Sequence, residues 1–398
     1  MYERGFSMIE ALVATALALS VTAAALALVR SSEGHFSVRE EAVDMHQRLR
    51  VAAGTLYGDL LHAGAGADRG PNRGPLAQFF APVLPYRQGT GQDDPVGSFS
   101  KDTITVMFVP STAAQTTLSA AAPGGVSGEI SLNIDSGCPV ADPVCGFRKD
   151  MRLVLYDAGG QYDTFTVTDA RSNPLQAQRV GRGLTSASYD ANTTTVAQLV
   201  NVVYSLKVNR VTDTYQLVVN DGGNGNDVPV VDHLVALEFE YFGDPNPPVL
   251  TGRAVTEPVG PWTSYGPAPP TPDRQIPTQG YPPGENCIFI VDPLTGVHLP
   301  RLDNLALGGS SGLVPLTQAR LTDGPWCPDA ASQTRWDADL LRVRRVGVTL
   351  RVQAANRALR GPAGLLFSNG GTSTGGYRWL PDQQIRLAIA PRNLEMGR

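Results

Sequence analysis

The chain opens with a short polar head followed by an almost unbroken apolar run. The run extends from Phe6 to Val29, and Glu10 is its one acidic residue. About 24 residues of α-helix rise about 36 Å, which is enough to cross a bilayer. The pattern therefore predicts a single membrane-spanning helix over residues 6–29, preceded by a short segment at 1–5.

Beyond Arg30, apolar residues recur at steps of three and four, which is the period of an amphipathic helix. The stripe consists of Ala42, Met45, Leu49, Ala52, Leu56 and Leu60. Gly64 and Gly66 follow it and are typical of a helix end. We expect the helix to continue over 30–66 and to pack its stripe against a head formed by 67–398.

The head shows the period of two that is typical of half-buried strands. In the stretch 233–241, Val235, Leu237, Phe239 and Tyr241 share one face, and 346–352 repeats the alternation. Strands are also predicted over 103–109, 129–134, 151–156, 164–168 and 384–390, with a hairpin over 201–208 and 214–219. One buried and one wet face favour an antiparallel sheet resting on a helix, which is an α+β fold.

Composition agrees with a large, loop-rich head. The 398 residues include 42 Gly and 31 Pro, and 17% are charged. About 330 residues beyond the helix are enough for a sizeable core. The net charge of −5 argues against a nucleic-acid-binding surface.

Nine prolines lie between Thr251 and Asn286. Because proline has no N–H to donate to a β-ladder, this segment is expected to form an exposed, semi-rigid loop of polyproline type. Such a long loop is either a partner-contacting surface or a variable insertion.

Four cysteines lie in the head, at Cys138, Cys145, Cys287 and Cys327, and none forms a CxxC pair. Three pairings are possible. Proximity favours Cys138 with Cys145, which leaves Cys287 with Cys327. Disulfides would place the head in an oxidising compartment such as the periplasm, whereas four separate thiols would suit the cytosol.

Candidate chemistry in the head is sparse. Oxygen-bearing side chains over 220–227 suggest a weak Ca²⁺ site, and its candidate ligands are Asp221, Asn224, Asn226 and Asp227. The alternative is an ordinary hairpin loop. Gly308–Gly312 has the letters of a nucleophile elbow, but it lacks a strand before, a helix after and a placed His partner. We therefore expect no enzyme and no cofactor.

Glu10 needs an explanation, because an acidic side chain at the centre of a membrane helix costs about 3 kcal/mol. One explanation is a harmless charge that reaches the interface. A cleaved secretory signal is a second, but this apolar run is too long, and the small residue Gly5 precedes it.

The N-terminal residues also resemble a known signal. Gly5 followed by Phe6-Ser7-Met8-Ile9-Glu10 is similar to the class III signal of type IV prepilins and type II secretion pseudopilins. The C-terminal part, with strands near Glu238–Tyr241 and 346–352 and the segment Pro391–Leu394, resembles PilW-like minor pilins and the larger minor pseudopilin.

The resemblance implies cleavage between Gly5 and Phe6 by a prepilin peptidase and N-methylation of the new Phe6 amine. Glu10 would neutralise that amine on a neighbouring subunit, so that two charges that are each expensive in lipid become a pair. The implied fold is a pilin-like head on a long helix. The implied partners are other pilins or pseudopilins and an inner-membrane assembly platform.

The implied location is the inner membrane, crossed once with the head in the periplasm, and later the filament. The favoured function is a minor pilin that acts in the initiation or tip complex of a type IV pilus. A minor pseudopilin of type II secretion is the alternative within the family. From other classes, a pilus-tip adhesin would use the Pro-rich loop for recognition, and a membrane-anchored periplasmic enzyme is the remaining possibility.

Overall fold

The computed structural model describes most of the chain between residues 7 and 395. It leaves out 90, 92, 96, 125–126, 181–187, 212–213, 222–225, 252–262, 275–279, 307–311, 329–334 and 363–378, and the side chains of 28–37. The predictions at Gly5, Phe6, Asn224 and residues 308–311 therefore lie outside the described residues. The chain forms two compact units, an N-terminal unit (1–50 with 351–384) and a head unit (51–350 with 385–398).

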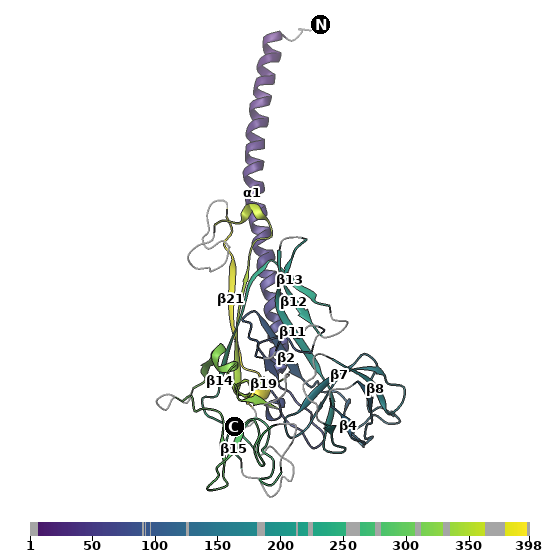
Figure 1. Cartoon of the computed structure of the whole chain (residues 1–398). Coiled ribbons are helices and arrows are strands. Elements are labelled where there is room, and N and C mark those ends of the chain that lie inside the picture. Colours follow the sequence, from purple (N-terminus) through teal and green to yellow (C-terminus); the bar gives the residue numbers. More distant parts are fainter. Residues whose placement is uncertain are drawn as a thin grey trace. The chain divides into compact units, whose positions relative to one another are not determined.

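A single helix, α1, runs from Met8 to His62 (Figure 1). Its N-terminal half is rich in Ala and Leu, the strongest helix formers. It ends four residues before the predicted boundary at 66, because the Gly64 N–H donates to the Met107 carbonyl at 3.0 Å instead of continuing the helix. Gly64 has φ +78°, a left-handed conformation that glycine adopts without a steric penalty.

The predicted apolar stripe is buried, except that Ala42 is half-buried. Met45 and Leu49 are at most 7% exposed. Ala52, Leu56 and Leu60 are completely buried. In the head unit, Tyr204 donates a hydrogen bond from its hydroxyl to the Asp59 carboxylate. From Met45 to Leu60, the residues of the predicted stripe therefore lie on a buried side of the helix.

In the N-terminal unit, helix α1 contacts the turn that follows the strand ending at Val352. The Glu41 carboxylate accepts hydrogen bonds from the backbone N–H groups of Ala355 at 2.6 Å and Asn356 at 3.3 Å. Arg351 and Asp382 form a buried ion pair at 3.7 Å. A carboxylate on α1 thus satisfies donors of a turn more than 300 positions away in sequence.

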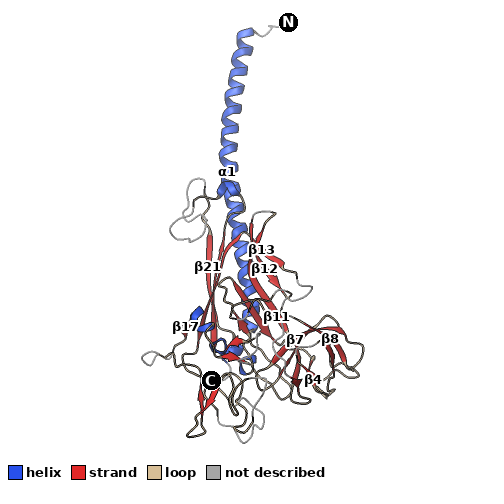
Figure 2. Cartoon of the chain, in the orientation of Figure 1, coloured by secondary structure: helices blue, strands red, loops and turns tan. Residues whose placement is uncertain are grey.

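The first sheet of the head is five-stranded and antiparallel throughout, in the order β1-β2-β11-β12-β13. Figure 2 labels its strands β11, β12 and β13. Its strands are β1 (Val83–Leu84), β2 (Thr103–Phe108), β11 (Val200–Asn209), β12 (Thr214–Asn220) and β13 (Val228–Asp232). The ring of His62, the last residue of α1, stacks on Phe108 with 5.5 Å between centroids. Together with the Asp59–Tyr204 bond, this places the end of α1 against β2 and β11.

A second sheet belongs to a lobe inserted between β2 and β11. The chain leaves the first sheet after Phe108 and returns at Val200, and these two residues face each other in the β2–β11 ladder. We call residues 109–199 the inserted lobe. Its six-stranded antiparallel sheet has the order β3-β10-β6-β7-β8-β5, and Figure 1 shows β7 and β8 apart from β11–β13. The strands are β3 (Gln115–Thr117), β10 (Thr195–Gln198), β6 (Arg152–Tyr156), β7 (Tyr162–Asp169), β8 (Leu175–Arg179) and β5 (Gly128–Ile130).

The inserted lobe has its own apolar core and an aromatic contact to the rest of the head. The core includes Leu118, Phe147, Leu153, Phe165, Tyr189 and Val196. Outside it, the Phe80 ring stacks on Tyr162 with 4.0 Å between centroids. Asn72 donates to the Tyr156 carbonyl at 3.2 Å and accepts at its own carbonyl from the Tyr156 hydroxyl at 2.8 Å. The lobe is therefore packed onto the head rather than tethered to it.

A third sheet of four strands has the order β17-β14-β20-β21. These are β17 (Val314–Leu316), β14 (Leu234–Gly243), β20 (Val343–Val352) and β21 (Gln383–Ile389). On β14 the alternation is as predicted, with Glu238 and Glu240 exposed. The prediction of a wet second face for 346–352 is wrong, because Thr349 and Arg351 on that face are only 6% and 4% exposed. Arg344, earlier in β20, is also buried, and its guanidinium lies over the Tyr265 ring at 4.9 Å.

Smaller elements complete the fold. Three two-stranded pairs are β4 (Ala122–Pro123) with β9 (Ser188–Tyr189), β15 (Phe289–Val291) with β16 (His298–Pro300), and β18 (Trp326–Cys327) with β19 (Trp336–Asp337). The short helices are η1 (Leu76–Gln78), η4 (Gln318–Leu321), η5 (Ala338–Arg342), η6 (Arg357–Leu359) and α2 (Arg392–Glu395). The α+β class is confirmed.

Most predicted strands exist with boundaries moved by one to three residues. The predicted hairpin is confirmed as β11 paired with β12, in register from Val203–Asn220 to Asn209–Thr214. The strand expected over 129–134 is shorter and ends at Ile130. Beyond it only an isolated bridge joins Leu132 to Leu118, and Ile134 is 49% exposed.

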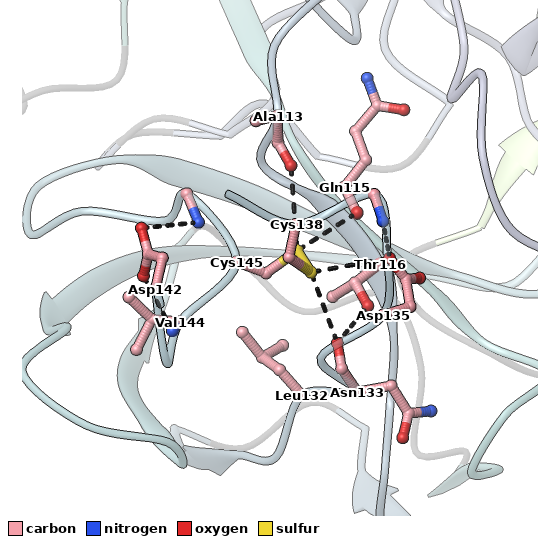
Figure 3. The surroundings of a disulfide bond; sticks show 12 residues. Ala113, Gln115, Thr116, Leu132, Asn133, Asp135, Cys138, Asp142, Val144 and Cys145 are labelled. Carbon is pink, nitrogen blue, oxygen red and sulfur yellow. Dashed lines mark hydrogen bonds between the residues drawn. A yellow bond between two sulfur atoms is a disulfide. The ribbon is translucent and has the colours of Figure 1, made fainter. Parts of the chain in front are cut away.

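The pairing that proximity favours is present in both disulfides. Cys138–Cys145 closes a loop of the inserted lobe (Figure 3). Within that loop the Asp142 carboxylate accepts from the Val144 and Gly146 N–H groups at 3.0 and 3.3 Å. Cys287–Cys327 joins the end of the Pro-rich segment to β18.

The exposed loop predicted for the Pro-rich segment is correct only for part of the described residues: 271–274, 280, 282 and 283 are exposed, but other positions are buried. Thr263, Tyr265 and Tyr281 are at most 8% exposed, and the two tyrosine hydroxyls donate to the carbonyls of Asn246 and Trp326 at 2.7 Å. Asn286 donates to the carbonyls of Pro267 and Ala268 at 3.0 and 3.1 Å. The Asn286 side chain thus satisfies two carbonyls of the proline-rich backbone near Pro267, which is buried.

The two bridges should differ in their contribution to stability. In the chain-entropy description a bridge with a separation of 40 residues restricts the unfolded chain more than one with a separation of 7. We expect Cys287→Ser to lower the free energy of unfolding by about 1.5 kcal/mol more than Cys138→Ser. Denaturant unfolding of the two variants in detergent measures this. Equal losses, or a larger loss for Cys138→Ser, would contradict it.

Candidate membrane and assembly segment

The N-terminal part of α1 has the length and composition of a membrane span. Met8–Ala27 comprises 20 residues with mean hydropathy 1.9, and none of the segment is buried within the chain. Twenty helical residues cover about 30 Å, which matches the hydrocarbon core of a bilayer. By length and composition, this helix is able to cross a membrane.

Its apolar side chains are exposed on every side of the helix. Met8, Ile9 and Leu19 are 83%, 72% and 71% exposed, and the adjacent pair Leu12 and Val13 point in different directions at 62% and 54%. A helix that is apolar all round needs an apolar environment on all sides. The described residues of the chain do not provide such an environment.

The few hydroxyl groups of the segment are satisfied within the helix. Thr15, Ser20 and Thr22 each donate to the backbone carbonyl four residues earlier, at 2.9, 2.8 and 2.7 Å. Because unsatisfied polar groups are costly in hydrocarbon, these bonds make the three residues compatible with lipid.

Glu10 lies in the first turn of α1 and is exposed. Its Oε2 accepts a hydrogen bond from the Ser7 backbone N–H at 3.0 Å, and the Ser7 hydroxyl accepts one from the Ile9 N–H at 3.3 Å. This reciprocal arrangement is a capping box. Sequence reasoning singled out Glu10 but missed Ser7, although Ser followed three residues later by Glu is the signature of such a box.

The weak Ca²⁺ candidates do not form a recognisable site in the part that the structure describes. The Asp227 carboxylate pairs with Lys207 at 2.6 Å and accepts from the Asn220 amide at 3.2 Å. Asp221 and Asn226 are exposed. These contacts support the hairpin-loop alternative.

A different group of carboxylates, which sequence reasoning missed, lies beside the second disulfide. Oxygens of Asp323, Asp337 and Asp339 lie within 4.8 Å of one another. Both buried members already have partners. Asp337 accepts from the N–H groups of Gly324 and Asp339 at 2.6 and 2.8 Å, and Asp339 pairs with the buried Arg342 at 2.5 Å. We therefore assign the group a structural role.

Burial changes the acidity of this group. It raises the pKa of Asp337 to about 7, and the carboxylates of Asp339 and Asp323 add to the shift while two backbone N–H bonds oppose it. It raises the pKa of Asp339 to about 6, against the opposing charge of Arg342. The fold thus holds a proton on this cluster at mildly acidic pH.

Comparisons with protein-family models, with curated proteins and with solved structures find no match to the chain.

The acidic cluster predicts a pH dependence. The pKa of Asp337 is raised in the folded state. The protonated carboxyl therefore contributes fully to the free energy of unfolding below about pH 4, and this contribution is lost as the pH rises through about 7. Asp337→Asn removes the charge but keeps only one of the two acceptor oxygens, so the predicted quantity is the pH dependence: its loss of stability between pH 4 and pH 8 should be roughly 2–4 kcal/mol smaller than that of wild type. Chemical denaturation at both pH values measures this.

The exposed Asp273→Asn provides the charge-matched control and should follow wild type at both pH values. An Asp337→Asn variant that shows the same loss of stability between pH 4 and pH 8 as wild type would contradict the prediction.

Proposed function

We propose that the protein is a minor pilin, a structural subunit that enters a type IV filament through its N-terminal helix. The observation that carries the proposal is an unburied apolar helix with one carboxylate, Glu10, in its first turn. Such a helix requires apolar partners on all sides, and the carboxylate requires a positive one. A bundle of identical or related helices in a filament supplies both.

Processing supplies the positive charge in this proposal. The run from Gly5 to Glu10 resembles the class III signal, in which cleavage after the glycine creates a new amine on Phe6. An ammonium and a carboxylate are each costly in lipid, but a pair of them is less so. Neighbouring subunits would therefore bind more strongly than two plain apolar helices.

The β-rich head and its two disulfides suit an oxidising compartment such as the periplasm. A minor pseudopilin of a type II secretion system is the alternative, because it would use the same signal and helix. Recovery of the chain in sheared surface pili favours the pilin, and loss of secretion without loss of pili favours the pseudopilin. A pilus-tip adhesin is a further alternative, and it would use the exposed positions 271–274 of the Pro-rich segment rather than the buried Tyr265 and Tyr281.

Gly5 is expected to be essential for processing. A peptidase that reads a small residue before its cleavage point should reject Gly5→Val, which leaves the leader attached and blocks filament entry. Intact-mass measurement of the membrane-bound chain should find wild type beginning at Phe6 with one added methyl group. Glu3→Gln serves as the leader control and should be processed. A mature wild-type chain that begins at Met1 would overturn the family assignment.

Glu10 is expected to be needed for assembly and dispensable for insertion. Glu10→Leu removes the cost of a carboxylate in lipid, so membrane insertion should be at least as efficient as in wild type. Incorporation into filaments should fall at least tenfold, because the neighbour's amine loses its counter-charge. Quantification of the chain in sheared filaments against the membrane fraction measures this.

Thr15→Leu is the matched control for Glu10→Leu. It also replaces a polar residue by Leu, but the Thr15 hydroxyl bonds only within its own helix. Incorporation of this variant should stay near wild type. Normal incorporation of Glu10→Leu would show that the carboxylate has no role in assembly.

A further inference from the structure

A cleft of about 400 Å³ lies where the inserted lobe meets the first sheet. Its walls are residues 148–152 at the start of β6, residues 198–202 from the end of β10 into β11, and Asp221 directly after β12. The volume is within the range typical of ligand sites, which is about 300–1,000 Å³. All of these residues belong to the head unit.

The first residues of β11 have a partner strand on one side only. β11 pairs with β2 from Val200 onward, but it pairs with β12 only from Val203, which lies opposite Asn220. Among the described residues, 200–202 thus have a neighbouring strand on the β2 side alone. Their other edge lies along the cleft.

The backbone of Asn201 faces that open edge. Its partner in the β2 ladder is Met107, whose N–H donates to the Pro82 carbonyl at 2.9 Å and whose carbonyl accepts from the Gly64 N–H at 3.0 Å. Both backbone groups of Met107 are therefore used on the side away from β11. Opposite residues of an antiparallel pair either exchange both bonds or exchange none, in alternation. Asn201 is thus in a pair without hydrogen bonds, and its N–H and C=O face the cleft.

The opening along this edge is one residue long. On one side of Asn201, the Leu199 N–H already donates to the Arg152 carbonyl at 3.0 Å. On the other side, Val203 is paired with Asn220. A longer strand cannot lie along β11 between these two blocks. A single residue at a chain end fits the opening and can complete both backbone bonds of Asn201.

A turn behind the cleft holds two of its residues in place. The Gly89 carbonyl accepts from Arg152 Nη1 at 2.7 Å, and the Gln88 carbonyl accepts from Asn201 Nδ2 at 3.1 Å. Gly89 has φ +77°, and a Cβ there would lie 1.8 Å from Asn201 Nδ2, so only glycine allows this approach. Arg152 and Asn201 are 8% and 2% exposed. The open edge of β11 is therefore held by contacts on its buried side.

The charges of the cleft favour a carboxylate over an amine. The exposed side chains of 148–150 and Asp221 carry two positive and two negative charges, which balance and are screened by water. The buried charge of the cleft wall is the Arg152 guanidinium. Burial lowers the pKa of Arg152, and the carboxylates of Asp221 and Asp93 offset this only in part. An added negative charge would therefore stabilise the guanidinium.

We propose that this cleft binds the C-terminal residue of a peptide. The N–H of that residue donates to the Asn201 carbonyl, and its terminal carboxylate accepts from the Asn201 N–H, with the positive charge of Arg152 in the wall of the cleft. This is the addition of a strand to a sheet edge, limited to one residue. The inference does not depend on the proposed function, because it concerns the head and not the assembly of α1.

The test titrates the full chain in detergent with a library of acetylated tripeptides that have free C-terminal carboxylates. The same library with C-terminal amides is the control. The backbone amide signal of Asn201, labelled with ¹⁵N-asparagine, reports the site. The free acids should shift this signal and bind about tenfold more tightly than the amides, as expected for a hydrogen bond to a charged group. Acetate at the same concentration should leave the signal in place.

Two variants at position 201 separate the backbone donor from the side chain. N201A and N201P both lose the amide that contacts Gln88, but only N201P loses the backbone N–H. Because that N–H is not part of the β2 ladder, proline is compatible with the strand there. Calorimetric titration with the tightest-binding free acid should show about tenfold weaker binding to N201P than to N201A. Thermal unfolding of both variants checks that they fold.

Four results would overturn the inference. They are an Asn201 signal that no peptide moves, equal affinity for acids and amides, equal affinity of folded N201A and N201P, and a signal that acetate moves as far as the acids do. The last result would make the cleft a site for small carboxylates. If N201P does not fold, the comparison of acids with amides on the wild-type chain decides.

Discussion

The structure depends on one unmet requirement, which is an apolar environment for the first half of α1. Eight large apolar side chains of this segment are at least half exposed, namely Met8, Ile9, Leu12, Val13, Leu17, Leu19, Val21 and Leu26. Full burial of each is worth about 1.5–3 kcal/mol, so the eight together are worth about as much as the 5–15 kcal/mol by which a domain is typically stable, or more. Transfer of this helix to an apolar environment would therefore be a large term in the free energy of the chain.

The same helix meets a different constraint at its other end. Leu56 and Leu60 are enclosed by the head, and the Gly64 N–H binds the Met107 carbonyl of β2. Asp59 accepts from the Tyr204 hydroxyl, a polar contact directly beside that apolar packing. The two ends of this helix therefore follow different sequence patterns. The first end has apolar residues on all sides, and the second has them along one stripe that is buried in the head.

Sequence reasoning predicted the features that local periodicity encodes. The stripe of α1, the β11–β12 hairpin and the alternation on β14 all repeat at 3.6 or 2 residues, and Glu10 stands out from its apolar surroundings. It missed the short strands β1, β3, β4 and β9, since two or three residues carry no period. It also missed that Asn286 donates to carbonyls near position 267, in a buried part of the proline-rich segment. Such contacts join positions far apart in sequence, and a linear pattern does not encode them.

The inserted lobe shows how the head can be large without disturbing the helix contact. Phe108 and Val200 are paired, so 91 intervening residues leave and re-enter the first sheet at one point of the β2–β11 ladder. The register of these strands beside α1 is set by the ladder and not by the length of the insertion. Loop-closure entropy grows only slowly with length, and the paired ends are held by the sheet itself. The apolar core of the lobe and the Phe80–Tyr162 stack offset the conformational entropy lost when the lobe folds. The surface of the lobe can therefore vary while the contact between α1 and the first sheet stays fixed.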